Sequence, residues 1–119
     1  PLFVSPFDVY SDGHGKIYVS EPSRGFVHVV DLQLGVLGFL KADRPGKNLD
    51  LQSPTGISGT ADGRIYVVDS RAGAILIFGA NGRQVGHWLI EKNSIVKKLK
   101  NLQGQGGCKL YCLLWNQIL

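Results

Sequence analysis

The chain has 119 residues and a formal net charge of +4, a length that suffices for one domain with its own hydrophobic core. The charge is uneven: residues 1–90 hold as many Lys and Arg as Asp and Glu, and the excess of 13 basic over 9 acidic residues lies in residues 91–119. Because nucleic-acid affinity depends largely on phosphate neutralisation, the neutral part argues against a nucleic-acid partner.

The two cysteines, Cys108 and Cys112, both lie in residues 91–119, and no histidine accompanies them there. A protein zinc site needs three or four ligands, so we interpret the pair as incidental thiols and expect neither a metal nor a cofactor. No apolar run is long enough for a membrane span, and no signal peptide is present. These features leave the localisation open.

The first ninety residues predict strands joined by tight turns. In chain order, β-branched and aromatic runs predict strands over residues 7–10, 16–20, 26–30 and 36–40, followed by strands over residues 54–59, 65–69, 74–78 and 84–89. Asn81-Gly82 is a strong hairpin signal, because both residues tolerate positive φ. Asp12, in the turn over residues 11–15, fits turn chemistry better than a calcium site.

A shift of 48 positions superimposes the two groups of strands. Residues 5–6 then fall on 53–54, residues 17–19 on 65–67, and Gly25 on Gly73. A fixed period of this size marks a repeat architecture. The strands are nearly continuously apolar and no amphipathic helix separates them, which favours radially packed propeller blades over a sandwich or a parallel α/β sheet.

The expected fold is therefore all-β, with two four-stranded antiparallel blades over about residues 3–40 and 51–90, joined by a linker over residues 41–53. Residues 54–57 read Pro-Thr-Gly-Ile, residues 63–70 read Gly-Arg-Ile-Tyr-Val-Val-Asp-Ser, and residues 75–78 read Ile-Leu-Ile-Phe. In these segments the chain resembles the NHL-repeat family of six-bladed β-propellers. This resemblance implies a binding propeller and favours an extracytoplasmic location.

The repeat stops near residue 90, although the sequence continues to residue 119. Two units fall short of a closed ring, and the chain does not begin with Met, so we expect it to be part of a longer protein whose remaining blades are its partners. For residues 91–119 three interpretations stay open: a basic amphipathic helix, a structural cap, or a non-native chain end.

The linker and the second turn of each blade should share one propeller face, where long loops on a rigid scaffold concentrate binding residues. The candidate binding residues for a protein or peptide partner are Arg24, Arg71, Lys41, Arg44 and Lys47. No catalytic or metal-binding residue is assigned, since Asp8 and three scattered histidines make no constellation. Alternative functions are part of a propeller metalloenzyme of lyase or lactonase type, with its site in the central channel, and RNA binding.

Overall fold

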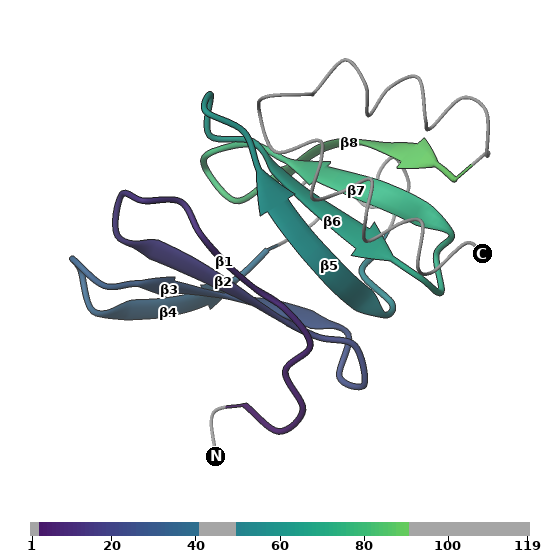
Figure 1. The fold of residues 1–119 in the computed structure, drawn as a ribbon, viewed down its shortest axis with the longest axis horizontal. Coiled ribbons are helices and arrows are strands. Elements are labelled where there is room, and N and C mark those ends of the chain that lie inside the picture. Colours follow the sequence, from purple (N-terminus) through teal and green to yellow (C-terminus); the bar gives the residue numbers. More distant parts are fainter. Residues whose placement is uncertain (1–2, 41–49, 91–119) are drawn as a thin grey trace.

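A computed structural model of the chain describes residues 3–40 and 50–90. These residues form two four-stranded antiparallel sheets, in which each strand pairs with the next along the chain (Figure 1). The first sheet, or first blade, comprises β1 (Val9–Ser11), β2 (Lys16–Glu21), β3 (Phe26–Asp31) and β4 (Val36–Phe39). The second blade comprises β5 (Pro54–Gly59), β6 (Ile65–Asp69), β7 (Ala74–Phe78) and β8 (Gln84–Leu89).

The all-β fold with two four-stranded blades is confirmed. Within the described ranges the structure contains no helix, and so none long and apolar enough to cross a membrane. The tail over residues 91–119 and most of the linker, residues 41–49, lie outside the described part of the chain. The interpretations offered for the tail therefore stay predictions.

Two local details differ from the expectation. The first strand begins at Val9 instead of residue 7, because the pairing with Ser20 is irregular there: the Phe7 amide donates to the Ser20 carbonyl at 2.9 Å, and the Asp8 amide donates to the Ser20 hydroxyl at 3.1 Å. In the hairpin at Asn81-Gly82 only Gly82 has positive φ, at 81°. Asn81 Oδ1 instead accepts the Arg83 amide at 3.1 Å, and the β7–β8 register shifts beside the turn. The hairpin is present, as predicted, but it is bulged.

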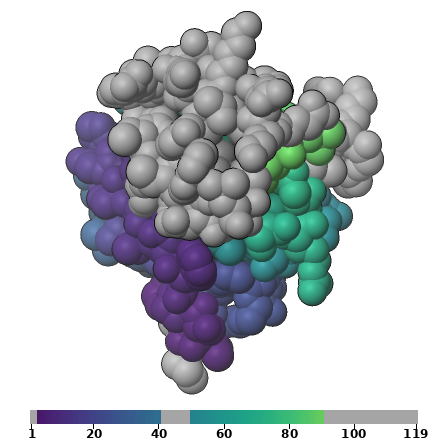
Figure 2. Space-filling view, turned by 45° about the vertical axis from the view of Figure 1, so that its right-hand side comes forward, coloured from purple at the N-terminus to yellow at the C-terminus, as the bar shows by residue number. Residues whose placement is uncertain are grey.

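The two blades share one hydrophobic core. The first contributes Tyr18, Val27 and Leu40 to it, and the apolar face of the second contributes the rest: Ile57, Ile65, Val67, Ala74, Leu76 and Phe78. In the space-filling view the purple and blue atoms of the first blade lie directly against the teal and green atoms of the second (Figure 2). Burying one such aliphatic side chain stabilises the fold by about 1.5–3 kcal/mol, so this interface holds the blades together.

Hydrogen bonds between the inner strands fix the position of one blade relative to the other. Asp8 Oδ2 accepts the backbone N–H of Ile57 at 2.9 Å, and the Ser20 hydroxyl donates to the Thr55 carbonyl at 2.5 Å. Asp8 therefore has the structural role of a strand-end carboxylate. Its carboxylate joins the blades.

A buried carboxylate ends the second strand of each blade. Glu21 and Asp69, which are 48 positions apart, are both fully buried. Each accepts two backbone N–H groups from the segment that enters the first strand of its own blade. Val4 and Ser5 each donate to Glu21 at 3.0 Å, and Gln52 and Ser53 donate to Asp69 at 2.7 and 3.0 Å. Because buried amides need acceptors, these carboxylates fasten the entering segments.

Candidate functional site: a groove between the blades

A cleft of about 480 Å³ lies between the blades at the end where β1 turns into β2 and β5 turns into β6. The first blade lines it with side chains from its first two strands and their turn, and the second blade with the turn from Gly59 to Gly63. The lining residues are Tyr10, Asp12, His14, Lys16, Tyr18, Gly59, Thr60, Ala61, Gly63, Ile65 and Ala80. This volume lies in the range of ordinary ligand sites.

Two tyrosines form the wall of the cleft that the first blade contributes. Tyr10 on β1 pairs with Tyr18 on β2 in the ladder, so both side chains lie on the face that meets the second blade, with ring centroids 6.1 Å apart. Gly59 allows Tyr10 to approach, since a Cβ at that position would overlap the Tyr10 hydroxyl. The cleft therefore depends on a glycine from the other blade.

The tyrosines keep their protons well above neutral pH. Burial raises the pKa of both hydroxyls, and the nearby Asp12 carboxylate raises the pKa of each further. The neutral phenol can donate as well as accept a hydrogen bond. At neutral pH the cleft is thus lined by two neutral tyrosine side chains, the Asp12 carboxylate and the Lys16 ammonium, among others.

A second hollow, of about 240 Å³, continues from the cleft toward the outer strands. It shares Lys16 and Tyr18 with the cleft, and extends along β3 and β4 to the hairpin at Asn81-Gly82. The two hollows meet at these shared side chains and together form the groove, as we call the combined site. A groove that runs from the inner to the outer strands suits an extended ligand.

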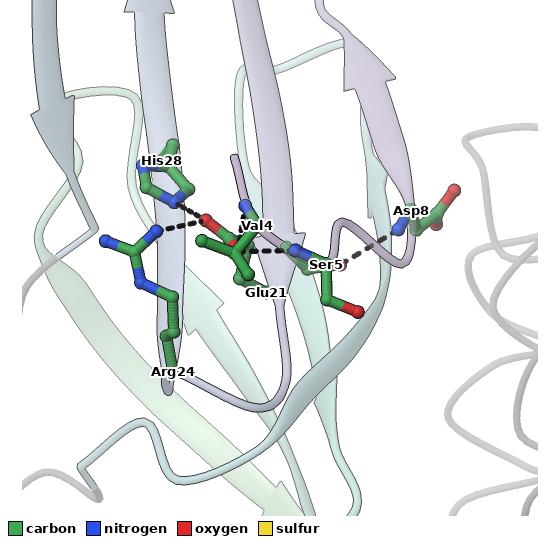
Figure 3. A network of polar contacts seen from close by, with 7 residues as sticks. Val4, Ser5, Asp8, Glu21, Arg24 and His28 are labelled. Atoms are coloured by element: carbon green, nitrogen blue, oxygen red, sulfur yellow. Dashed lines mark hydrogen bonds and ion pairs between the residues drawn. The ribbon is translucent and has the colours of Figure 1, made fainter. Parts of the chain in front are cut away.

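The opposite end of the first blade carries a different polar cluster. Figure 3 shows the Glu21 carboxylate between His28 and Arg24 on one side and the Val4 and Ser5 amides on the other. His28 Nε2 lies 2.6 Å and the Arg24 guanidinium 3.1 Å from Glu21 Oε1. The backbone N–H of Ser5 above all, then that of Val4, with His28 and Arg24, lower the pKa of Glu21 to about 2 against the effect of burial.

His28 lies in an aromatic setting on the outward face of the first blade. Its ring centroid is 4.9 Å from that of Phe3, 6.0 Å from that of Phe26 and 5.3 Å from that of Phe39. His28 is buried with one nitrogen on Glu21. The cluster is therefore occupied by its own side chains, and its role is structural.

Of the residues predicted to bind a partner, two can be placed. Arg24 and Arg71 lie in the β2–β3 and β6–β7 turns, at the end opposite the groove. Arg71 is exposed, whereas Arg24 pairs with Glu21 and lies 5.4 Å from the centre of the Phe26 ring. Lys41, Arg44 and Lys47 lie outside the described residues. The sequence-based choice of these five residues as a binding site stays a prediction.

The groove residues were missed by sequence reasoning, although a signal for them exists. Tyr10 and Asp12 stand where the second blade has Ser58 and Thr60, so they depart from the repeat. Where the two blades differ in this way, their shared fold does not require one particular side chain. Asp12 also has the turn role predicted for it, since its Oδ1 accepts the backbone N–H groups of His14 and Lys16 at 2.7 and 3.1 Å.

Comparison with solved structures identifies the architecture. Two structures of virginiamycin B lyase from Staphylococcus aureus resemble this chain, one of the selenomethionine-substituted protein and one of a catalytically inactive histidine-to-alanine variant with quinupristin. Their TM-scores are 0.58 and 0.57, at 12% sequence identity over 75% of this chain. The two blades have the fold of a β-propeller.

The comparison covers only part of each solved structure. The chain spans 28% of the length of these lyases, so their activity belongs to proteins several times longer. No family model matches the sequence, and no curated protein does. The predicted propeller architecture is confirmed, while membership of the NHL family stays a prediction. Among residues 3–40 and 50–90, no group of three or more His, Cys, Asp and Glu residues could hold a metal ion.

Proposed function

We propose that these blades are a protein- or peptide-binding part of a β-propeller and that the groove receives the partner. The observation that carries this proposal is the meeting of the two hollows at Lys16 and Tyr18, which makes one open groove across the face of the first blade. Aromatic rings with polar tips are the side chains that dominate protein recognition sites. The blade interface holds them in place at little entropic cost.

We propose the groove as the binding site, and not the opposite end of the blades, because one of the two arginines at that end already contacts residues of its own blade. Arg24 is engaged by Glu21 and Phe26, so a partner would have to compete with contacts inside the blade. Arg71 is exposed and remains available. The two ends can therefore be separated by substitutions that leave the core untouched.

The test is selection of binders from a phage library of random heptapeptides, followed by affinity measurement with synthetic copies. Ala61 and Ala80 are exposed residues at the edge of the cleft, so Ala61→Trp and Ala80→Trp should fill it and abolish binding. Arg71→Ala serves as the control and should bind normally. Loss of binding in Arg71→Ala with normal binding in Ala61→Trp would move the site to the opposite end.

A second candidate function is favoured by the comparison itself. The resemblance to virginiamycin B lyase supports the proposal that this chain is part of a propeller enzyme of lyase type. In this proposal further blades supply the reacting groups. At 12% identity this resemblance carries only the fold. Incubating a protein that carries these two blades together with the further blades with quinupristin, and separating the mixture by chromatography, tests this candidate, for which a new product peak is the expected result.

A further inference from the structure

The electrostatic character of the cleft distinguishes it from the rest of the groove. Asp12 uses Oδ1 to accept two turn amides, and its Oδ2 accepts no hydrogen bond from the described residues. That carboxylate lies close enough to Tyr10 and Tyr18 to raise the pKa of both hydroxyls, after the larger effect of burial. Tyr10, Tyr18 and Asp12 line one cleft together with Lys16. The Oδ2 atom of Asp12 is therefore an anionic acceptor beside the two aromatic rings.

Other charged groups lie near the tyrosines. Asp31, at the end of β3, also raises the pKa of Tyr18, and its Oδ1 is held by two turn amides in the same way as that of Asp12. Asp31 lines the second hollow and pairs with Lys16 in the ladder. Lys16 lines both hollows, and its ammonium makes no ion pair with a described residue. The cleft thus holds the two rings and the Asp12 carboxylate, and Lys16 lies where the cleft meets the second hollow.

We propose that the cleft binds the basic side chain of a partner peptide, with its guanidinium or ammonium group between the tyrosine rings and Asp12 Oδ2. A cation is attracted by the face of an aromatic ring and by a carboxylate, and both are present within one cleft. The Lys16 ammonium then lies where the peptide backbone continues, and its donors face the carbonyl groups of that backbone. This inference rests on the proposed function and names the chemistry of its partner.

The corresponding turn of the second blade can be compared with the turn that holds Asp12. In the second blade the position of Asp12 is taken by Thr60 and that of Tyr10 by Ser58. The acidic residue of that turn, Asp62, accepts from Thr60 and from the Arg64 amide, and its carboxylate lies 3.7 Å from the Arg64 guanidinium. The Asp62 carboxylate therefore has a guanidinium beside it, whereas Asp12 makes no ion pair with a described residue. Of these two turn carboxylates, Asp12 is the one that lines the cleft.

The experiment uses two panels of fluorescein-labelled heptapeptides that differ only in the central residue, arginine in one and the neutral isostere citrulline in the other. Fluorescence anisotropy with the whole protein should show about tenfold tighter binding of the arginine panel. Asp12→Asn keeps the Oδ1 acceptor and hence the turn, so it should remove the difference without unfolding the blade. Asp62→Asn, the matched control, should leave the difference intact.

The possible outcomes distinguish failure of the basic-ligand inference from failure of the proposed function. Equal binding of both panels, with both weakened by Ala61→Trp, overturns the basic-ligand inference and leaves the groove as a peptide site. Equal effects of Asp12→Asn and Asp62→Asn also overturn it, because the preference would then come from overall charge. Binding of neither panel, together with no peptide selected from the library, overturns the inference and the proposed function together. Circular dichroism of each variant shows whether the sheets are intact.

Discussion

The two blades have the same strands and turns but differ in what covers them. Every residue of β5, β6 and β7 in the second blade is buried, whereas the first blade exposes much of its outward face. Its exposed apolar side chains include Val9, Phe26, Leu37 and Phe39. Val9 is 57% exposed, while Ile57, its counterpart 48 residues on, is fully buried. The repeat therefore specifies the backbone of a blade. Contact with the first blade determines the burial of the face of the second blade that meets it, which includes Ile57.

The register explains why these two residues differ so much. Ile57 pairs with Val67 on the face of the second blade that meets the first, and Val9 pairs with Val19 on the outward face of the first blade. The first blade thus has the same docking face as the second, without a described neighbour on it. In a propeller each blade presents one such face to the blade before it.

Polar chemistry separates the blades as well. The second blade ends β6 with Asp69, whose carboxylate reaches only nearby amides, including that of Ala72 at 2.9 Å. The first blade has the longer Glu21 at this position, together with His28 and Arg24 where the second blade has Leu76 and Ala72. The side chain of Glu21 is longer than that of Asp69 by one methylene group. The Glu21 carboxylate contacts backbone amides, His28 and Arg24, whereas the Asp69 carboxylate accepts backbone amides alone among the described residues. The first blade has therefore diverged at its outward face and its cleft.

The largest expected effect tests the difference in burial directly. Ile57→Ala removes a fully buried side chain from the shared core and should lower the free energy of unfolding by about 3 kcal/mol. Val9→Ala, the same kind of change at the equivalent position, should cost less than about 0.5 kcal/mol. Urea denaturation of the two variants measures the difference. Similar losses would mean that something covers the outward face in solution.

The next effect concerns the contact that joins the blades beside the cleft. Gly59→Ala places a Cβ against the Tyr10 hydroxyl and should destabilise the protein by about 1.5 kcal/mol. Tyr10→Ala removes the obstacle, so in that background Gly59→Ala should cost almost nothing. A double-mutant cycle from urea denaturation gives the coupling energy. Additive losses would contradict the close approach of the two residues.

A smaller effect is expected from the uncovered apolar face. Such a face favours association with another apolar surface, so the protein should self-associate as its concentration rises. Phe39→Ser should weaken that association about tenfold, equivalent to about 1.4 kcal/mol. Leu89→Ser changes an apolar residue of similar exposure on the second blade and should have little effect. Sedimentation velocity over a hundredfold concentration range makes the measurement, and a monomer throughout would argue against the prediction.

The smallest expected effect is a pH dependence that belongs to the first blade. The fold lowers the pKa of Glu21 from 4.5 to about 2, so the ionised carboxylate stabilises the folded state fully above about pH 4.5. This contribution is lost as the pH falls from about 4.5 to about 2, where the folded protein also takes up the proton. Glu21→Gln should flatten the loss of stability in this window, as measured by thermal melts at stepped pH. Asp62→Asn, which changes an exposed carboxylate of the second blade whose pKa is also lowered, should flatten it less.

The strands could be predicted because their signals are local. Runs of β-branched and aromatic residues produced the bounds of β5, β6, β7 and β8, and glycines at the turns have the positive φ that such turns require. Gly25 and Gly73, 48 positions apart, have φ of 72° and 63°. The bounds of β2, β3 and β4 differ from the prediction by one residue, and the start of β1 differs by two, because the Ser20 hydroxyl accepts the Asp8 amide there.

The groove could not be predicted, because it is built by residues far apart in the chain. Gly59 is unremarkable until Tyr10 is found against it, and the Asp8 carboxylate bonds a residue 49 positions away. The sequence instead predicts binding by basic residues of the turns and the linker, because charged residues are visible in a sequence. Arg24 is one of them, and the structure shows that its guanidinium pairs with Glu21.

By itself, the sequence determined an all-β repeat of two four-stranded blades with a 48-residue period, because strand propensity, turn glycines and apolar runs act over a few residues. The tertiary structure decided which blade face is covered, where Tyr10 meets Gly59, and which carboxylate oxygen accepts no hydrogen bond from the described residues. Those features depend on the distance and orientation of side chains from different blades. No local pattern of residues encodes such distances, so only the packed structure displays the groove and its charge.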